Sequence, residues 1–196
     1  MKKNKLLLII WLTPLWAFSQ TVSSQFSSQE LKGNEFSISV GYMFEGEGYA
    51  AYFDQYFSVG ETILIRSEFD HYFSAMGNRF GFGAYYMLGF PYYSYVYEVV
   101  TMHEFGLVLK GRLNAGEKLL IKPGIYTGYR SYSGGEYTTV GPGTGFGLNA
   151  SLAFQFQTNG IKPFIDLGIM TQPAGGNDET DITYSPTFQI NFGITF

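Results

Sequence analysis

Residues 186–196, PTFQINFGITF, are the stretch that decides the fold. Their large apolar side chains fall on every second residue, at Phe188, Ile190, Phe192, Ile194 and Phe196. Successive side chains of an extended strand point to opposite faces, so these five share one face. The other face is small and uncharged, whereas an exposed strand of a water-soluble protein usually carries charge there. The stretch therefore predicts a strand whose apolar face meets something other than water.

The same alternation recurs in seven earlier segments, which are residues 36–44, 63–70, 79–90, 104–113, 119–130, 145–157 and 161–170. Their apolar faces hold no Asp, Glu, Lys or Arg, although these residues make up 14% of the chain. The strand charges lie on the opposite faces, the reverse of a soluble barrel. The pattern predicts an all-β fold, an eight-stranded antiparallel up-and-down transmembrane β-barrel whose charges point inward.

The inward faces are expected to carry a network of charged side chains, made of Arg66, Glu68, Arg79, Lys110, Arg112, Lys122, Arg130 and Asp166. The interior of an eight-stranded barrel is only just wide enough for side chains. Glycines concentrate on these same faces, where they leave room for the larger side chains. We predict a packed, ion-paired lumen, with a narrow ion channel as the alternative. The substitution Asn149→Arg, in the lumen, should then cost less stability than Leu167→Arg on the apolar face.

The connections between the predicted strands alternate in length. Residues 45–60, 91–103, 131–143 and 172–185 are long, whereas 72–78, 114–118 and 158–160 are short. The long connections lack Lys and Arg and contain Glu45, Glu47, Asp54, Glu98, Glu136, Asp178, Glu179 and Asp181. This rhythm is typical of outer-membrane barrels and predicts extracellular long loops and periplasmic termini.

The N-terminus has the pattern of a secretory leader. Lys2, Lys3 and Lys5 precede a short apolar run, and small residues follow at Ala17 and Ser19. We predict a signal peptide over residues 1–19, a periplasmic tether over 20–34 and the barrel over 35–196. The chain has no Cys, which excludes disulfides and thiolate metal sites. Loss of the leader lysines makes the net charge of −4 more negative, which argues against a nucleic acid partner.

Two prolines and two histidines stand out within these segments. Pro123 and Pro163 each remove a hydrogen-bond donor from a strand, so we expect strand starts or bulges there. His71 is predicted at the periplasmic rim of the barrel and His103 at the outer rim. A barrel's height would separate them, so both are interpreted as interfacial polar residues.

The alternation, the loop rhythm, the segment 162–169 (KPFIDLGI) and the terminal Phe196 resemble the small eight-stranded outer-membrane proteins of the OmpA and OmpX type. The resemblance covers residues 36–196. It implies that the apolar face of residues 186–196 is the signal read by the barrel-insertion machinery, and that lipid or lipopolysaccharide of the outer membrane surrounds the chain. It does not fix the function, because the fold hosts adhesins, structural anchors and lipid A enzymes.

We predict a monomeric protein with a structural or adhesin-like surface role, without catalysis, cofactor or metal. Tyr92, Tyr93, Tyr95 and Tyr97 would extend two strands as a Tyr-rich ribbon that offers a surface to an extracellular protein partner. An aromatic girdle at the membrane interface explains the same tyrosines equally well.

A lipid A-modifying enzyme, a deacylase or an acyltransferase, is the main alternative function. Lipid A deacylases use a His and a Ser two residues apart, whereas Phe105 stands two residues after His103. The acidic run 177–181 (NDETD) has oxygen ligands that suit Ca²⁺ but lacks the spacing of a calcium-binding loop. We interpret this run as a solvated loop.

Overall fold

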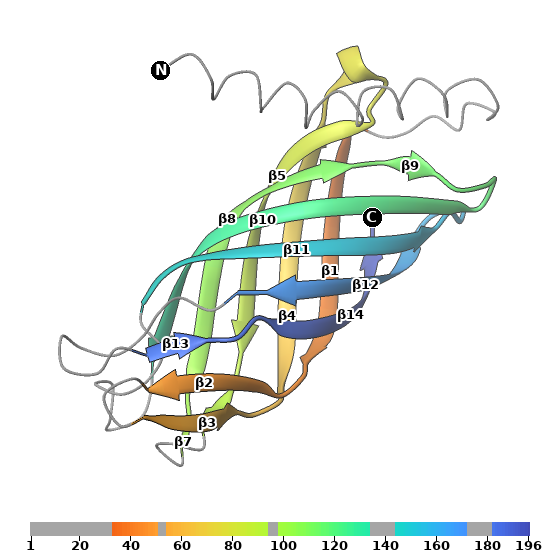
Figure 1. Ribbon diagram of the computed structural model, residues 1–196. Coiled ribbons are helices and arrows are strands. Elements are labelled where there is room, and N and C mark those ends of the chain that lie inside the picture. Colours follow the sequence, from red (N-terminus) through yellow and green to blue (C-terminus); the bar gives the residue numbers. More distant parts are fainter. Residues whose placement is uncertain (1–32, 51–53, 94–97, 134–143, 172–181) are drawn as a thin grey trace, which may run out of the picture. The chain divides into compact units, whose positions relative to one another are not determined.

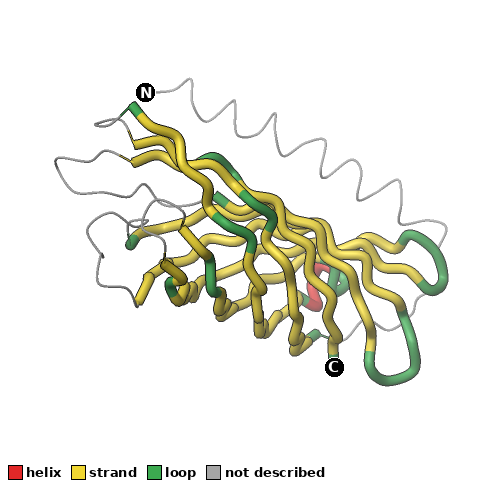
Figure 2. The backbone as a smooth tube through the Cα atoms, turned by 90° about the horizontal axis from the view of Figure 1, so that it is seen from below, coloured by secondary structure: helices red, strands yellow, loops and turns green. Residues whose placement is uncertain are grey.

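A closed barrel is the main feature of the computed structural model, which describes residues 33–50, 54–93, 98–133, 144–171 and 182–196. Its eight strands are β1 (Asn34–Met43), β4 (Thr62–Tyr72), β5 (Phe80–Gly89), β8 (Thr101–Gly111), β10 (Leu119–Ser133), β11 (Gly145–Phe156), β12 (Lys162–Met170) and β14 (Thr187–Thr195). Each pairs antiparallel with the next in this order, and β14 pairs with β1 to close the sheet (Figures 1 and 2). The predicted eight-stranded antiparallel barrel is confirmed.

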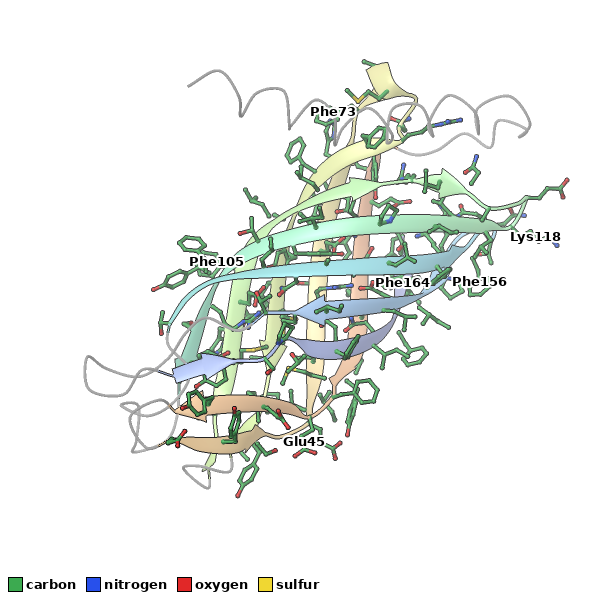
Figure 3. The ribbon with its side chains drawn as sticks, in the orientation of Figure 1. Glu45, Phe73, Phe105, Lys118, Phe156 and Phe164 are labelled. Carbon is green, nitrogen blue, oxygen red and sulfur yellow. The ribbon has the colours of Figure 1, made fainter. Side chains whose placement is uncertain are left out.

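The two faces of the barrel wall have opposite character, as the alternation predicts. Leu107 and Leu109 in β8 are 62% and 66% exposed, whereas Val108 between them is 1% exposed. Figure 3 shows Phe105, on the same face as Leu107, pointing away from the barrel. The large apolar side chains therefore cover the outside of the wall, and the charged ones are buried inside.

Glycines on the inner face leave room for bulky neighbours. A Cβ at Gly193 in β14 would collide with the ring of Phe164 in β12, and a Cβ at Gly124 would lie 2.8 Å from Cε2 of Tyr126. The glycine on the outer face, Gly111, has another cause, because its Cβ would lie 3.2 Å from Cγ of Pro123 on the facing strand. The narrow lumen and the proline ring thus account for these glycines.

The two prolines differ in their surroundings. Pro163 is the second residue of β12, which matches the expected strand start. The expectation for Pro123 is wrong, because Pro123 is the fifth residue of β10 and the register on either side of it shows no bulge. Instead the facing strand is interrupted at Arg112, between β8 and the short β9 (Leu113–Asn114). Proline has no N–H to donate to that strand, so the ladder has a gap with the register unchanged.

Part of the wall continues beyond the barrel as a second sheet, sheet B. Its strands are β13 (Ile182–Tyr184), β2 (Gly46–Ala50), β3 (Gln55–Val59), β6 (Tyr92–Tyr93) and β7 (Glu98–Val99). They pair in this order, which repeats the order of the adjoining barrel strands β14, β1, β4, β5 and β8 (Figure 1). Residues 45–60, expected as a long loop, thus contain the hairpin of β2 and β3.

The two ends of the barrel differ. The end that adjoins sheet B, here called the long-loop end, carries Glu45, whereas Phe73 and Lys118 lie at the opposite, short-turn end (Figure 3). One short turn contains the 3₁₀-helix η3 (Ser74–Met76). Within the described ranges, no helix is long and apolar enough to cross a membrane. The predicted leader, residues 1–19, and most of the predicted tether lie outside the described residues.

Candidate functional site

A group of basic side chains surrounds Glu35 inside the barrel at the short-turn end. The Glu35 carboxylate lies 2.8 Å from Nη2 of Arg112, 2.7 Å from Nζ of Lys122 and 3.6 Å from Nζ of Lys162. The Arg112 guanidinium also stacks on the ring of Tyr72, with 3.2 Å between its Cζ and the ring centroid. These contacts join β1, β4, β10 and β12 to the residue that follows β8.

A second group fills the middle of the lumen. Arg66 forms ion pairs with Asp166 and, at 3.8 Å, with Glu68. Lys110 pairs with Glu68 and, at 3.0 Å, with Asp70. All five side chains are at most 8% exposed. Because unpaired buried charges are strongly destabilising, this pairing is what allows the lumen to hold them.

The third group is centred on Glu104, nearer the long-loop end. Its carboxylate, 0% exposed, accepts hydrogen bonds from the Tyr85 hydroxyl, from Nε of Arg130 at 2.5 Å and from Nδ2 of Asn149 at 2.8 Å. Arg130 also donates from Nη1 to the backbone carbonyl of Thr171, at 2.8 Å. Four strands, β5, β8, β10 and β11, thus meet at one buried carboxylate.

An apolar cluster lies beyond these charges, towards the long-loop end. The barrel strands contribute five side chains there that are at most 1% exposed, Met43, Leu64, Met87, Met102 and Met170. Val108 belongs to the same cluster but lies deeper in the lumen, between Glu104 and Lys110 on β8. Val59 of sheet B and Tyr184 of β13 pack with them. Unbranched methionine side chains adapt to irregular gaps, so this cluster closes the lumen with apolar atoms.

The lumen is therefore a filled interior. A cavity lined by Arg66, Lys110, Lys122 and their neighbours remains, with room for about one water molecule. Of the predicted lumen residues, Arg79 lies apart. It is half-buried just before β5, and no ion pair between described residues includes it. Glu35 was not predicted from the sequence. Extending the alternation of β1 by one residue before Phe36 would have placed Glu35 on the inward face, together with Ser37 and Ser39.

Sheet B carries aromatic and acidic side chains on its outer face. Tyr49 and Tyr56 are cross-strand partners with ring centroids 4.9 Å apart, and Tyr56 is 71% exposed. The Tyr49 hydroxyl donates to Asp54 at 2.8 Å, and this hydrogen bond to a carboxylate raises the pKa of Tyr49. Tyr92 is 37% exposed in the ribbon of β6 and β7. Tyr93 belongs to β6, whereas Tyr95 and Tyr97 lie outside the described residues, as does the run 177–181.

The two histidines lie on the outer face of the wall, far from each other. His71 is opposite Phe82 and His103 is opposite Leu88, six residues further along β5, or about 20 Å. They cannot form one site. Nδ1 of His71 lies 2.8 Å from Oδ1 of Asn34, and Nδ1 of His103 lies 2.7 Å from the Tyr86 hydroxyl. A serine near His103 comes from the neighbouring strand, with Oγ of Ser133 at 3.5 Å from Nε2.

The predicted insertion signal lies along the outside of β14. Phe188, Phe192, Ile194 and Phe196 are exposed, with Phe188 at 64%, and Ile190 is half-buried. The Phe196 ring stacks on Phe36 of β1, with centroids 6.3 Å apart, at the seam where the barrel closes. The apolar face of this strand is thus continuous with that of the first strand.

Two small outer-membrane barrels of known structure have similar folds. The crystal structure of Neisserial surface protein A (NspA) matches with a TM-score of 0.57 at 9% identity, covering 84% of this chain and 96% of that one. Outer membrane protein OprG from Pseudomonas aeruginosa matches with a TM-score of 0.58 at 12% identity, covering 87% and 99%. No protein-family model and no curated protein matches the sequence.

The closed wall of eight strands, its apolar outside and these two structures define the class. The chain has the fold of the small eight-stranded outer-membrane β-barrels, with transmembrane strands, and the predicted resemblance to that class is confirmed. Identities of 9% and 12% relate the folds alone. The function therefore depends on the chain's own surfaces, which the shared fold does not determine.

Proposed function

We propose that the protein is a surface-interaction protein of the bacterial outer membrane, without catalysis, which binds an extracellular protein partner through sheet B. In this proposal the long-loop end faces the outside of the cell and both ends of the barrel chain face the periplasm. The observation that carries the proposal is the continuation of five neighbouring wall strands into sheet B. A barrel that served only as an anchor would not need an ordered sheet beyond the membrane.

The chemistry of sheet B indicates the kind of partner. Glu45, Glu47, Asp54 and Glu61 are exposed on it or at its junction with the barrel. The segments 45–61, 91–100, 131–143 and 172–185 contain no Lys or Arg. The paired rings of Tyr49 and Tyr56 add rigid contact area at low cost in conformational entropy. An acidic and aromatic face favours a basic segment of another protein, through charge complementarity and cation–π contacts.

The filled lumen supports an anchoring role for the barrel itself. Arg112 and Arg130, at 2% and 0% exposure, are ion-paired across the interior, and the methionine-rich cluster covers them towards the long-loop end. An ion would have to break these pairs to pass. We therefore expect no stable conductance in planar-bilayer recordings, and a stable large conductance would favour the channel alternative.

Adherence of cells that carry the protein tests the proposal. Bacteria expressing the full chain are expected to adhere to a surface coated with a basic protein more than to one coated with an acidic protein of similar size. Replacing Tyr56 and Tyr92 with serine should reduce the adherence severalfold, because both side chains are exposed on sheet B.

The matched control replaces two apolar residues that face the membrane, Leu107 and Ile125, with alanine. These side chains are 62% and 58% exposed. The control variant therefore loses two large exposed side chains, as the tyrosine variant does. Adherence that does not change with the tyrosine variant, at equal surface amounts of protein, contradicts the proposal. Mass spectrometry of lipid A from cells with and without the chain separates the enzyme alternative, which requires a changed lipid A.

A further inference from the structure

A small polar group interrupts the apolar outer wall near the long-loop end. Tyr86 of β5, His103 of β8 and Ser133 of β10 come from three adjacent strands and all face outward. Phe105, Leu107 and Leu109 continue the outward face of β8 and are 58–66% exposed. Polar groups that face lipid are costly unless they find hydrogen-bond partners. This group therefore needs an explanation.

The histidine ring is held between two hydroxyl groups. Nδ1 of His103 lies 2.7 Å from the Tyr86 hydroxyl and Nε2 lies 3.5 Å from Oγ of Ser133. The Tyr86 ring lies alongside, with centroids 6.2 Å apart and an interplanar angle of 36°. Both ring nitrogens are thus occupied, and the ring is fixed in one orientation on the wall.

This arrangement leaves a hydrogen-bond donor without an acceptor. A neutral imidazole donates from one ring nitrogen and accepts at the other, so one of the two hydroxyls donates to the ring and the other keeps its O–H free to donate outward. If the bound anion brings a second proton to the ring, both hydroxyls are free to donate. The described outward residues around it are Leu88, Thr101, Phe105, Tyr129 and Ser131, none of which is charged, while Glu104 and Arg130 on the same strands point into the lumen. The group therefore offers an anion at least one O–H donor, with no negative side chain beside it among the described residues of the outer wall.

We propose that Tyr86, His103 and Ser133 form a binding site for the phosphate group of a membrane lipid. The site opens on the side wall of the barrel, where the outward Leu88, Phe105 and Leu107 next to it can contact acyl chains. A lipid can place its chains against Phe105 and Leu107 while its phosphate accepts from the hydroxyls, whereas free phosphate gains only the polar contacts. Charge-assisted hydrogen bonds of this kind are about twice as strong as neutral ones. The site does not depend on the function proposed for sheet B.

Nuclear magnetic resonance of the full chain in uncharged detergent micelles, with ¹⁵N-labelled histidine, tests this proposal. Phosphatidic acid is titrated in, with diacylglycerol of the same acyl chains and inorganic phosphate as the other two arms. We expect phosphatidic acid to change the chemical shifts of the His103 ring nitrogens until they reach a plateau. Diacylglycerol should leave these chemical shifts unchanged. Inorganic phosphate should bind at least tenfold more weakly. His71, on the other rim of the wall, is the internal control, and the chemical shifts of its ring nitrogens should not change.

Two conservative variants test the geometry. Tyr86→Phe and Ser133→Ala should each weaken phosphatidic acid binding by up to about tenfold, the worth of one hydrogen bond. The heat-dependent gel migration of a folded barrel confirms that each variant is folded.

Four results would overturn the proposal. Equal changes in the chemical shifts of His103 with phosphatidic acid and with diacylglycerol would mean that the site does not recognise phosphate. Inorganic phosphate binding as tightly as the lipid would make the site a general anion site. Equal shifts at His71 and His103 would mean non-specific lipid contact. Release of fatty acid that Ser133→Ala abolishes would mean that the serine and histidine act chemically on the lipid.

Discussion

Replacing the Glu104 carboxylate with an amide tests whether the lumen charges hold the barrel together. Glu104→Gln keeps the shape of the side chain but removes the negative charge that Arg130, Tyr85 and Asn149 contact. Arg130 would keep its hydrogen bond to the Thr171 carbonyl, at 2.8 Å, but it would lose the carboxylate with which it forms an ion pair. Breaking a buried ion pair by removing one partner costs about 3–5 kcal/mol.

Denaturant unfolding of the barrel in phospholipid vesicles measures this cost. Both tryptophans, at residues 11 and 16, fall in the predicted leader, so circular dichroism of the strands is the better readout. The exposed Glu117→Gln serves as the control and should change the unfolding free energy by less than about 0.5 kcal/mol. Combining Glu104→Gln with Arg130→Gln removes both charges, so the double variant should cost about 1–3 kcal/mol less than the sum of the single ones. Strictly additive costs, or a cost of Glu104→Gln below about 1 kcal/mol, would mean that the pair of Glu104 and Arg130 does not stabilise the barrel.

Three further predictions follow from the same geometry. Leu167→Arg, at a position that is 47% exposed on the outer wall, should cost about 2–4 kcal/mol of unfolding free energy in vesicles; an unchanged unfolding curve would contradict its contact with lipid. Gly193→Ala should cost about 1–3 kcal/mol because the added methyl meets the Phe164 ring, and Phe164→Leu should restore part of the loss in the same assay. The phenol of Tyr49 should stay protonated to higher pH than an ordinary tyrosine, and Asp54→Asn should return its titration, followed by nuclear magnetic resonance of labelled tyrosine, towards the usual range.

The sequence predicted the wall of the barrel well because each strand obeys a local rule. The alternation along residues 186–196 and its seven counterparts decides which side chain faces outward, and this depends only on the two-residue repeat of a strand. The predicted strands therefore agree with the structure to within a few residues at each end. The acidic Glu35 escaped notice because it stands just before the first alternating apolar residue, outside the predicted strand.

What the sequence could not predict depends on contacts between strands. Ser133 and His103 are 30 residues apart, so their contact requires the register between β8 and β10. The pairing of β2, β3, β6, β7 and β13 into sheet B likewise needs the positions of three separate segments of the chain, the pairs β2–β3 and β6–β7 and the single strand β13. The expectation that Asn149→Arg is milder than Leu167→Arg loses its support, because Asn149 is 3% exposed and lies 3.4 Å from Arg130. A second arginine there would meet both a filled interior and a like charge.

Hydrocarbon is expected to contact the outside of the barrel wall, and water is expected to contact sheet B. The chain has no cysteine, so single cysteines at Leu107 and at Glu47 can each carry a spin label without further changes. In vesicles, the label at position 107 should collide with oxygen, which dissolves in lipid, far more often than with a water-soluble nickel complex, and the label at position 47 should show the opposite preference. A label at position 107 that is freely accessible to the nickel complex would mean that water, not hydrocarbon, contacts this face of the wall.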